Sequence, residues 1–512
     1  MNIYKIFLAI FTLSFLSIDL SAQSESPVDF DKMDAYFTQM VEDWDLPGAS
    51  IGIVKDGKLV FSGNYGIKEV GRAERPDNNT LYAIASNSKA FTATLIGMLV
   101  EEGKLDWNDP VRKYLPSFTM YDEWVSEHIT IRDILSHRSG LGTFSGDNIW
   151  YKSTKTGAEI VDAIKHVPQA YEFRSGYGYS NLMYITAGEV VRAVTGKSWG
   201  ENVKERILTP LNMNRTISAL DELEHKGNHS TPHARKENKN YSIPWVDWKN
   251  VEATGGLISS IEDMSKWMIF NLNHGIHKED TIISAATRNM IWTPHNNFTV
   301  DHTSENNLDR HFNAYGLGWS LSDYHGRLRV GHTGGYDGFI TAVNLIPDEN
   351  LGIVVLTNGV QSPIMAATYH ALDKMLGVDG VDWSEEMLAG VHRRQERDTR
   401  IADRISNRVM GTQPSLTKNK IVGDYHSDLV GKISIVEKAG DLILDFDEAP
   451  LLSAKLTHWH YDVWEIHWEH PQAWFSYGTI KINADNLHLV TGFDFDVPND
   501  DFFFEELKPS RE

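Results

Sequence analysis

Ala85-Ser86-Asn87-Ser88-Lys89-Ala90-Phe91 is the stretch around which the 512-residue chain is organised. Ser86 lies three residues before Lys89, and an apolar run with helical spacing follows. If a helix begins here, the two side chains lie one turn apart on one face, so the amine reaches the hydroxyl. A serine needs a neighbouring base to become a good nucleophile, and burial favours the neutral form of a lysine. Taken alone, however, the pair also fits a helix-cap serine and a surface lysine.

The first 23 residues are typical of a secretory signal. Lys5 supplies a positive charge, residues 6–18 are apolar, and the small residues Ser21 and Ala22 precede Gln23. The apolar segment is shorter than the roughly 20 residues that a spanning helix needs. We therefore expect cleavage near Ala22 or Gln23, a periplasmic or secreted protein, and no stable membrane anchor.

The bulk composition excludes several classes of partner and site. The formal net charge is -22, which argues against nucleic acid or an anionic membrane surface as a partner. The chain contains no cysteine, which excludes disulfides and thiolate metal sites. The histidines at positions 458, 460, 467 and 470 lack the regular spacing of three or four converging ligands, so solvated strand histidines are the favoured interpretation. We expect no metal and no cofactor.

The pattern of elements predicts an α+β first domain over residues 24–378. Residues 28–43 have the spacing of an amphipathic helix, and residues 49–62 form a hairpin pattern around Asp56-Gly57. Helical patterns fill the middle of the domain, four β-type runs occupy residues 315–358, and a final helix covers 363–376. This order favours an α+β fold, in which an antiparallel sheet has flanking helices and a helical subdomain, or a mixed sheet closed by the two ends of the domain.

The C-terminal quarter of the chain has a different pattern of residues. Residues 379–418 are highly charged and predict a linker that is partly helical. Residues 419–512 contain short β-type runs at regular spacing, the last at 502–507, which predict a small antiparallel barrel or sandwich. We expect Trp464, Trp468 and Trp474 to lie in the core of this barrel.

Two further motifs accompany the Ser86 stretch. Tyr179-Ser180-Asn181 lies where a glycine-rich loop meets a helix, and His332-Thr333-Gly334-Gly335 is flanked by strands. Each motif can also be explained by a purely structural role. Tyr179 could be an aromatic residue packed in a loop, and His332 could be a histidine at the end of a strand. Competing matches at Ser415–Lys418, in the linker, and at Lys155-Thr156-Gly157, where Thr156 and Glu159 form a capping box, have structural explanations. The order and context of the three motifs together favour catalysis.

This set resembles the serine β-lactamase and penicillin-binding-protein superfamily, whose signature is S-x-x-K with S-D-N and K-T-G. The Tyr-x-Asn and His-Thr-Gly variants look like the branch of class C β-lactamases, D,D-peptidases, D-aminopeptidases and esterases. His137-Arg138-Ser139-Gly140-Leu141 and Tyr315-Gly316-Leu317-Gly318-Trp319 are also similar to that branch. The resemblance covers roughly residues 28–377, and residues 420–508 look like the lipocalin-like domain appended to some of these hydrolases.

The resemblance implies a role for each motif. Ser86 would be the acyl-enzyme nucleophile, with Lys89 and Tyr179 as its general base pair. The substrate-binding and oxyanion residues would be Asn181, His332, Thr333, Gly334 and Gly335. Among these, Asn181 would hold the substrate amide, and His332 would replace the usual lysine near a substrate carboxylate. The N–H groups of Ser86 and Gly335 would form the oxyanion hole.

The sequence thus predicts a secreted serine hydrolase that needs no cofactor. Its substrate would be a small molecule or a peptide with an ester or amide bond, which leaves esterase, D-aminopeptidase, D,D-peptidase and β-lactamase activities open. One alternative is a catalytically silent binding or sensor protein on the same fold. Another is that the C-terminal barrel binds a ligand independently of the hydrolase. The natural substrate, the deacylation base and the oligomeric state are left open.

Overall fold

The computed structural model describes residues 28–301, 308 and 310–512. The predicted signal segment, residues 1–23, lies outside these residues. Within the described ranges, no helix combines the length and the apolar character that a membrane crossing requires.

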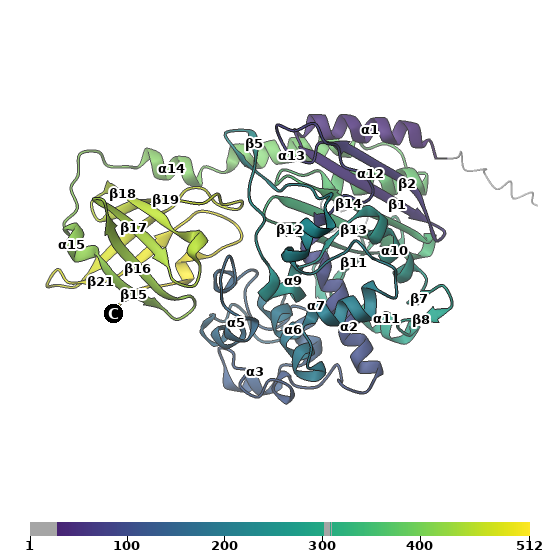
Figure 1. Ribbon diagram of the computed structural model, residues 1–512, viewed down its shortest axis with the longest axis horizontal. Coiled ribbons are helices and arrows are strands. Elements are labelled where there is room, and N and C mark those ends of the chain that lie inside the picture. Colours follow the sequence, from purple (N-terminus) through teal and green to yellow (C-terminus); the bar gives the residue numbers. More distant parts are fainter. Residues whose placement is uncertain (1–27, 302–307, 309) are drawn as a thin grey trace, which may run out of the picture.

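An eight-stranded antiparallel sheet forms the centre of the large domain (Figure 1). The N-terminal hairpin pairs with the last strand of the domain, with Ile53 opposite Ile353, so both ends of the domain close the same sheet, as predicted. In sheet order the strands are β2 (Lys58–Gly66), β1 (Gly48–Lys55), β14 (Leu351–Thr357), β13 (Phe339–Ile346), β12 (Arg327–Tyr336), β11 (Ser320–Tyr324), β10 (Asn313–Tyr315) and β9 (Asn296–Phe298).

Helices cover both faces of this sheet. On one face, α1 (Phe30–Asp43) buries Met33, Phe37 and Met40 at helical spacing against the strands, together with α12 (Ile364–Leu376). On the other face, α10 (Ile261–Leu272) packs against β1 and β14. Because both faces are covered, every residue of β14 is buried, which explains why its sequence is a continuous apolar run rather than an alternating one.

In the sequence, the helical subdomain lies between the first two strands of the sheet, β1 and β2, and its later strands, β9 to β14. Its central helix α2 (Ser88–Glu101) is buried on nearly all sides, as expected for a helix that is apolar all round. The other helices of the subdomain and its border are α3 (Glu123–His128), α4 (Ile131–Leu135), α5 (Gly157–Ala163), α6 (Asn181–Thr195), α7 (Trp199–Val203), α8 (Leu223–Lys226), α9 (Glu252–Gly255) and α11 (Ala285–Ile291). Short two-stranded ribbons pair β3 (Tyr82–Ala83) with β6 (Ile258–Ser259), β4 (His233–Lys236) with β5 (Lys239–Ser242), and β7 (Ile276–His277) with β8 (Asp280–Thr281).

The C-terminal part is a closed antiparallel barrel. Its strands are β15 (Gly423–Ser427), β16 (Gly431–Lys438), β17 (Asp441–Phe446), β18 (Ala454–His460), β19 (Val463–Trp468), β20 (Thr479–Ala484), β21 (Val490–Asp496) and β22 (Ser510–Arg511). The strand predicted at 502–507 is wrong: a short 3₁₀ helix, Phe504–Glu506, occupies this place. Phe504 contacts Phe475 and Phe495, so the apolar pattern there reflects packing at the end of the barrel rather than strand pairing.

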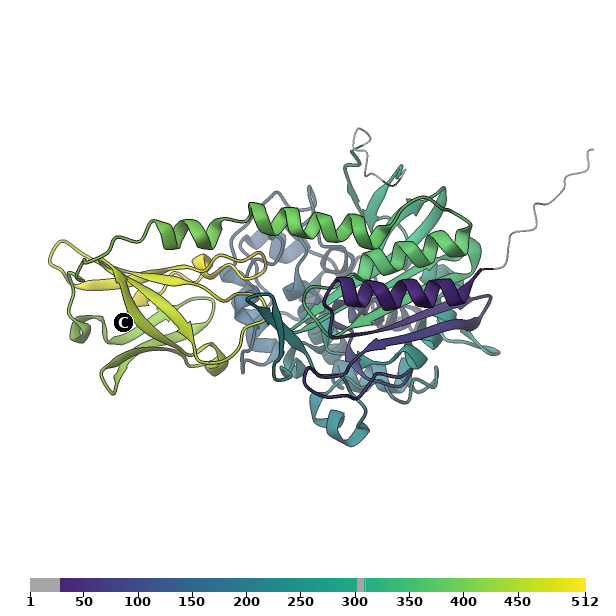
Figure 2. The ribbon, with the colours of Figure 1, turned by 90° about the horizontal axis from the view of Figure 1, so that it is seen from above.

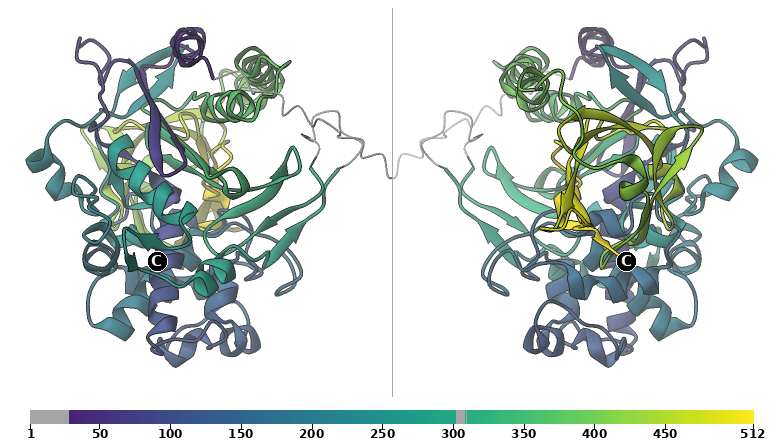
Figure 3. Two further views of the ribbon diagram at one scale, coloured as in Figure 1. Left: turned by 90° about the vertical axis from the view of Figure 1, so that its right-hand side faces the viewer. Right: turned by 90° about the vertical axis from the view of Figure 1, so that its left-hand side faces the viewer.

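Two helices connect the large domain to the barrel. In Figure 2, α13 (Trp383–Arg397) and α14 (Arg400–Ser406) follow one another along one side of the molecule. A short helix, α15 (Lys418–Ile421), precedes the barrel. Arg400 pairs with Asp500 and Arg404 pairs with Asp496, so α14 is held against the barrel by ion pairs. The barrel and the large domain lie end to end along the long axis of the molecule (Figures 1 and 2), so one lies in front of the other in the views along that axis (Figure 3).

Candidate active site

Ser86 lies on a tight turn at the start of α2. The turn spans Ala85–Asn87, and Ala85 has a left-handed φ of 48°, a conformation that costs about 1–3 kcal/mol outside glycine. Asn87 stabilises the turn, because its amide donates to the Ile84 carbonyl at 3.1 Å and to the Thr341 hydroxyl at 2.9 Å. Strand β13 therefore fixes the backbone that presents Ser86.

Lys89 is completely buried beneath Ser86. Its amine nitrogen Nζ lies 3.0 Å from Ser86 Oγ, 2.8 Å from Asn181 Oδ1 and 2.8 Å from the carbonyl oxygen of Thr254. Burial lowers the pKa of Lys89 well below its usual value, and the charge of Asp147 opposes this shift only in part. Burial therefore favours the neutral form of this amine.

Asn181 joins Lys89 to a buried carboxylate that the sequence analysis missed. The Asn181 amide nitrogen donates to Asp147 Oδ2 at 2.6 Å, and Trp150 Nε1 donates to Asp147 Oδ1 at 2.8 Å. Burial raises the pKa of Asp147 to about 7, although both hydrogen bonds lower it. Asp147 begins a short 3₁₀ helix, Asp147–Ile149, and belongs to no motif. No signal in the sequence therefore connected it to Lys89.

Tyr179 lies over the lysine amine. Its ring centroid is 4.8 Å from Lys89 Nζ. Burial raises the pKa of the Tyr179 hydroxyl well above 10, and the hydrogen bond to Ser86 acts in the opposite direction without reversing the shift. His137 packs against the Tyr179 ring at 4.3 Å and accepts a hydrogen bond from the Ser180 N–H at 3.0 Å. Tyr179 therefore remains a protonated phenol beside Ser86.

His332 on β12 has both ring nitrogens engaged within the protein. Nδ1 lies 2.6 Å from the Thr333 carbonyl, which only accepts, so Nδ1 carries the proton. Nε2 is then the acceptor for the Tyr315 hydroxyl at 2.9 Å. Burial lowers the pKa of His332 to about 3, and the charge of Lys89 adds to this effect. The ring offers neither a positive charge nor a free donor to a substrate carboxylate.

The residues after His332 bring β12 close to the nucleophile. A Cβ atom at Gly334 would lie 2.3 Å from the Ile84 carbonyl, so only glycine permits this approach. Thr333, Gly334 and Gly335 line the same cavity as Ser86. The structure thus brings together all eight of the predicted site residues, from three distant segments of the chain.

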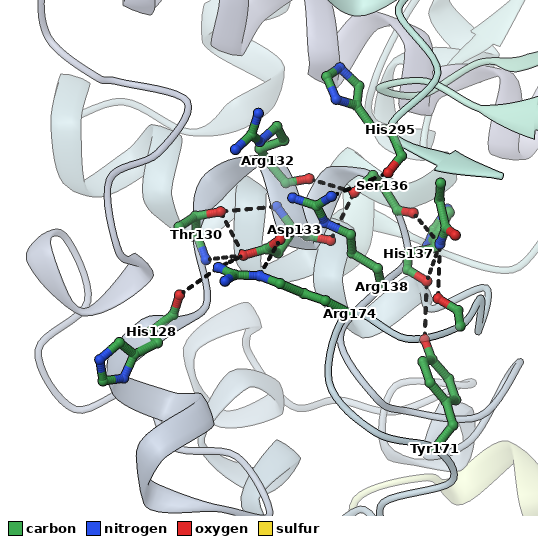
Figure 4. A network of polar contacts seen from close by, with 12 residues as sticks. His128, Thr130, Arg132, Asp133, Ser136, His137, Arg138, Tyr171, Arg174 and His295 are labelled. Atoms are coloured by element: carbon green, nitrogen blue, oxygen red, sulfur yellow. Dashed lines mark hydrogen bonds and ion pairs between the residues drawn. The ribbon is translucent and has the colours of Figure 1, made fainter.

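A second polar network supports the loops on which His137 and Tyr179 lie (Figure 4). Asp133 is fully buried, and its carboxylate accepts hydrogen bonds at 2.6 Å from both Arg138 and Arg174. Burial by itself raises the pKa of Asp133, but hydrogen bonds from Arg174 and Thr130 and the charge of Arg138 bring it below 3.8. Arg138 follows His137 directly, and Arg174 lies in the loop that leads to Tyr179.

The cavity above Ser86 is shared between the large domain and the barrel. Its volume is about 430 Å³. The barrel contributes Trp474, Asp501 and Phe502 to its lining. The prediction that Trp474 belongs to the barrel core is therefore wrong, because this ring lies at the domain junction, against Gly335. Trp464, by contrast, is buried within the barrel, and Trp468 is partly buried against the core.

The competing motifs have the local roles expected of them. Ser415 hydrogen-bonds to Asp462 of the barrel through its hydroxyl and its N–H. Thr156 and Glu159 form a capping box at the start of α5. Among the residues that the structure describes, no group of three or more histidines and carboxylates is placed to hold a metal ion.

Comparisons with known proteins agree with this fold and site, which together define a β-lactamase-like hydrolase fold. A family model described as Beta-lactamase matches residues 33–374, and a domain of unknown function, DUF3471, matches residues 407–510. The chain therefore belongs to the β-lactamase family.

The relatives and the solved structure that resemble this chain cover different shares of its length. It is 32% identical over 390 residues to "Unguisins hydrolase ungD'" of Aspergillus campestris, covering 72% of this chain and 70% of that protein. It is also 32% identical over 329 residues to "Protein flp" of Staphylococcus aureus, covering 61% of this chain and 60% of that protein. The solved structure of the octameric penicillin-binding protein homologue from Pyrococcus abyssi is similar in fold, with a TM-score of 0.62, 22% identity and coverage of 92% of this chain and 98% of that chain.

Proposed function

We propose that the protein is a serine hydrolase that cleaves an ester or amide bond through an acyl-enzyme on Ser86. The single observation that carries this proposal is the environment of Lys89, whose amine is buried, has a lowered pKa and lies 3.0 Å from Ser86 Oγ. Membership of a hydrolase family and relatives named as hydrolases support a hydrolytic reaction.

The hydrogen bonds of Lys89 support its role as the general base. A neutral amine has two N–H donors and one lone pair. Asn181 Oδ1 and the Thr254 carbonyl are acceptors, and together they take both donors. The lone pair is then directed at Ser86 Oγ, where it can accept the hydroxyl proton as the oxygen attacks a carbonyl carbon.

Tyr179 has the opposite protonation behaviour and therefore the complementary role. Its phenol keeps its proton because its pKa is raised, whereas that of Lys89 is lowered. Such a separation assigns the acid and the base within one site. In our proposal Lys89 takes the Ser86 proton, Tyr179 gives a proton to the leaving oxygen or nitrogen, and the Lys89 proton then restores Tyr179. Water attacks the acyl-enzyme in the second half-reaction and releases the acid.

The backbone N–H groups of Ser86 and Gly335 complete the proposed machinery. Both residues line the cavity. As the Ser86 Oγ–carbon bond forms, the carbonyl oxygen becomes negative, and two N–H donors fixed by the turn and by β12 stabilise this charge.

The proposal is tested by covalent labelling and turnover. We expect the purified protein to hydrolyse p-nitrophenyl acetate and to react once per chain with a fluorophosphonate probe, with the adduct on Ser86. Ser86→Ala should abolish both, whereas Ser415→Ala, in the competing motif, should change neither. Unaltered hydrolysis by the Ser86 variant would disprove the proposal, and failure of the wild-type protein to label would favour a silent binding protein instead.

The location of the protein stays a proposal that rests on residues 1–23. We propose export to the periplasm or the medium. Fractionation of cells that express the full chain should place the protein there, and deletion of residues 2–22 should retain it in the cytoplasm.

A further inference from the structure

Among the described residues that line the cavity above Ser86 are two with carboxyl groups, and no lysine or arginine. The carboxylates are Asp147 of the large domain and Asp501 of the barrel. His332 is neutral, as its two hydrogen bonds and its lowered pKa require, and burial lowers the pKa of Lys89 beneath the serine. The described walls of the cavity therefore offer a substrate carboxylate no fixed positive partner, and their acidic side chains are those of Asp147 and Asp501.

Asp501 is held rigidly in place by its own turn. The Asn499 side chain accepts hydrogen bonds from the N–H groups of Asp501, at 2.9 Å, and Phe502, at 2.6 Å. The same side chain donates to the carbonyls of Val497, at 2.8 Å, and Phe502, at 2.9 Å. This turn directs two consecutive aspartates in different directions: Asp500 pairs with Arg394 and Arg400 on the linker helices, whereas Asp501 lines the cavity.

The carboxylate of Asp501 lacks a close positive partner. Within the described parts of the chain, no lysine or arginine forms an ion pair with it, and Arg394, which acts on it from a distance, is already paired with Asp500. Burial raises the pKa of Asp501, and the charge of Asp500 adds to the increase. A partly buried carboxylate in this situation gains most from a cation that a ligand brings with it.

Aromatic rings line the same cavity as the two carboxyl groups. They belong to Trp150 and Trp248 of the large domain and to Trp474 and Phe502 of the barrel. The Trp150 and Trp248 rings are 5.1 Å apart, and Trp150 also bonds to Asp147. Ring faces attract cations, and they do so more strongly where water is excluded. Carboxylates combined with indole and phenyl faces are suited to an ammonium group.

We propose that the substrate carries a protonated amine, and that Asp501 of the barrel binds this amine while Ser86 attacks the neighbouring ester or amide carbonyl. This inference rests on the proposed function of Ser86. It assigns the barrel a direct part in substrate choice, through one side chain that lies more than 400 residues after the nucleophile.

Binding tests the proposal without turnover, and the Ser86→Ala variant serves for this purpose. Its cavity tryptophans report occupancy by fluorescence, and calorimetry gives the affinity. We expect benzylammonium to bind at least tenfold more tightly than benzyl alcohol or phenylacetate at pH 7.5. Asp501→Asn should remove this preference, whereas Glu505→Gln, which removes one exposed charge from the same segment, should preserve it. Equal or tighter binding of phenylacetate, or a preference that survives Asp501→Asn, would overturn the proposal.

Kinetics on a matched pair of substrates distinguishes this proposal from that of the hydrolase. The pair is D-alanine p-nitroanilide and isobutyric p-nitroanilide, which differ by an ammonium in place of a methyl group. In the wild-type protein we expect the ammonium compound to be favoured at least tenfold in kcat/KM. Asp501→Asn should reduce that ratio to near one, whereas Glu505→Gln should keep both the ratio and the hydrolysis of p-nitrophenyl acetate. Hydrolysis of p-nitrophenyl acetate without any preference would overturn the amine proposal alone. Absence of all hydrolysis together with retained benzylammonium binding would overturn the hydrolase proposal alone.

Discussion

Lys89 and Asp147 are kept apart by the side-chain amide of Asn181. The amide oxygen accepts from the lysine at 2.8 Å, and the amide nitrogen donates to the aspartate at 2.6 Å. A direct ammonium–carboxylate pair would favour the charged lysine, which has no lone pair for Ser86. The intervening amide lets both groups stay buried while burial lowers the pKa of Lys89 and raises that of Asp147.

Replacing Asn181 with aspartate tests this arrangement. Asn181→Asp places a carboxylate directly against Lys89 Nζ, so we expect the pKa of Lys89 to rise and kcat/KM for p-nitrophenyl acetate to fall roughly 10²-fold or more at pH 7. Activity should recover as the pH is raised and Lys89 loses its proton. A pH–rate profile from pH 5 to 10 measures this, with Asn181→Gln as the uncharged control. A loss of activity that is the same at every pH would contradict the expected cause.

We expect the ionisation of His332 to contribute no step to the pH profile of kcat/KM of the wild-type protein between pH 5 and 8. The pKa of His332 is about 3, so the ring is already neutral throughout the range from pH 5 to 8. We expect His332→Gln to lower kcat/KM for a neutral ester without changing the shape of the profile in that range. Chemical-shift titration of His332 by NMR gives a second measurement. A limb near pH 6.5 that disappears in His332→Gln would show that the ring ionises during the reaction.

Asp133 should contribute stability that depends on pH. Its pKa is below 3.8 in the folded protein, whereas an unfolded aspartate titrates near ~3.9. The unfolded state therefore binds more protons in the acid range, and the contribution is present above pH ~4 and is lost as the pH falls through the folded pKa. We expect Asp133→Asn to reduce the free energy of unfolding by about 3 kcal/mol at pH 7, and by less at pH 3.

Denaturant unfolding at the two pH values measures the Asp133 effect. Asp122→Asn is a suitable control, because Asp122 is a partly exposed helix cap on α3 and not part of the buried network. If Asp133→Asn lowers the free energy of unfolding equally at pH 7 and pH 3, then packing and neutral hydrogen bonds, and not the charge of Asp133, stabilise the network.

Lys152 should hold the barrel in its place over the site. Only 4% of its side chain is exposed, and its amine donates to the Pro471 carbonyl at 3.0 Å and to Gln472 Oε1 at 2.6 Å, while Asp337 lies 3.8 Å away. Lys152→Met leaves Asp337 buried without a cation, which should cost about 3–5 kcal/mol of stability. The double variant Lys152→Met with Asp337→Asn should recover part of this loss.

Thermal unfolding compares the Lys152 variants, and limited proteolysis of the linker at residues 407–417 reports whether the barrel has separated. Lys58→Met, at an exposed position on β2, is the control. A stable Lys152→Met variant with an intact, protease-resistant linker would show that the apolar rings at the junction suffice to hold the barrel.

Much of the fold could be predicted because its signals are local. The Asp56-Gly57 turn, the helical spacing of residues 28–43 and the β-type runs around His332 each specify an element through nearby residues. The strand expected at 502–507 was wrong because Phe502 and Phe504 pack against other elements. Alternating apolar residues produce the same sequence pattern in such a packed segment as in a strand that pairs within a sheet.

The site was predictable where its residues form short motifs, and only there. Ser86 and Lys89 are one helical turn apart, and His332 to Gly335 are consecutive. The types and the order of these residues therefore predicted that they lie in one active site. Asp147, Asp501 and Trp474 reach the cavity only through the packing of distant segments, and nothing within a few residues of them marks this. Their contribution could be recognised only once the barrel was seen against the large domain.

The shared cavity has a consequence for the synthesis of the protein. All the candidate catalytic groups have been translated once β14 is complete, yet the wall that carries Asp501 follows only after the linker helices and most of the barrel strands. Under our proposals, a nascent chain could therefore assemble the candidate catalytic groups before it acquires the carboxylate that selects an amine. The order of translation would then separate the proposed chemistry from the proposed selection of substrate.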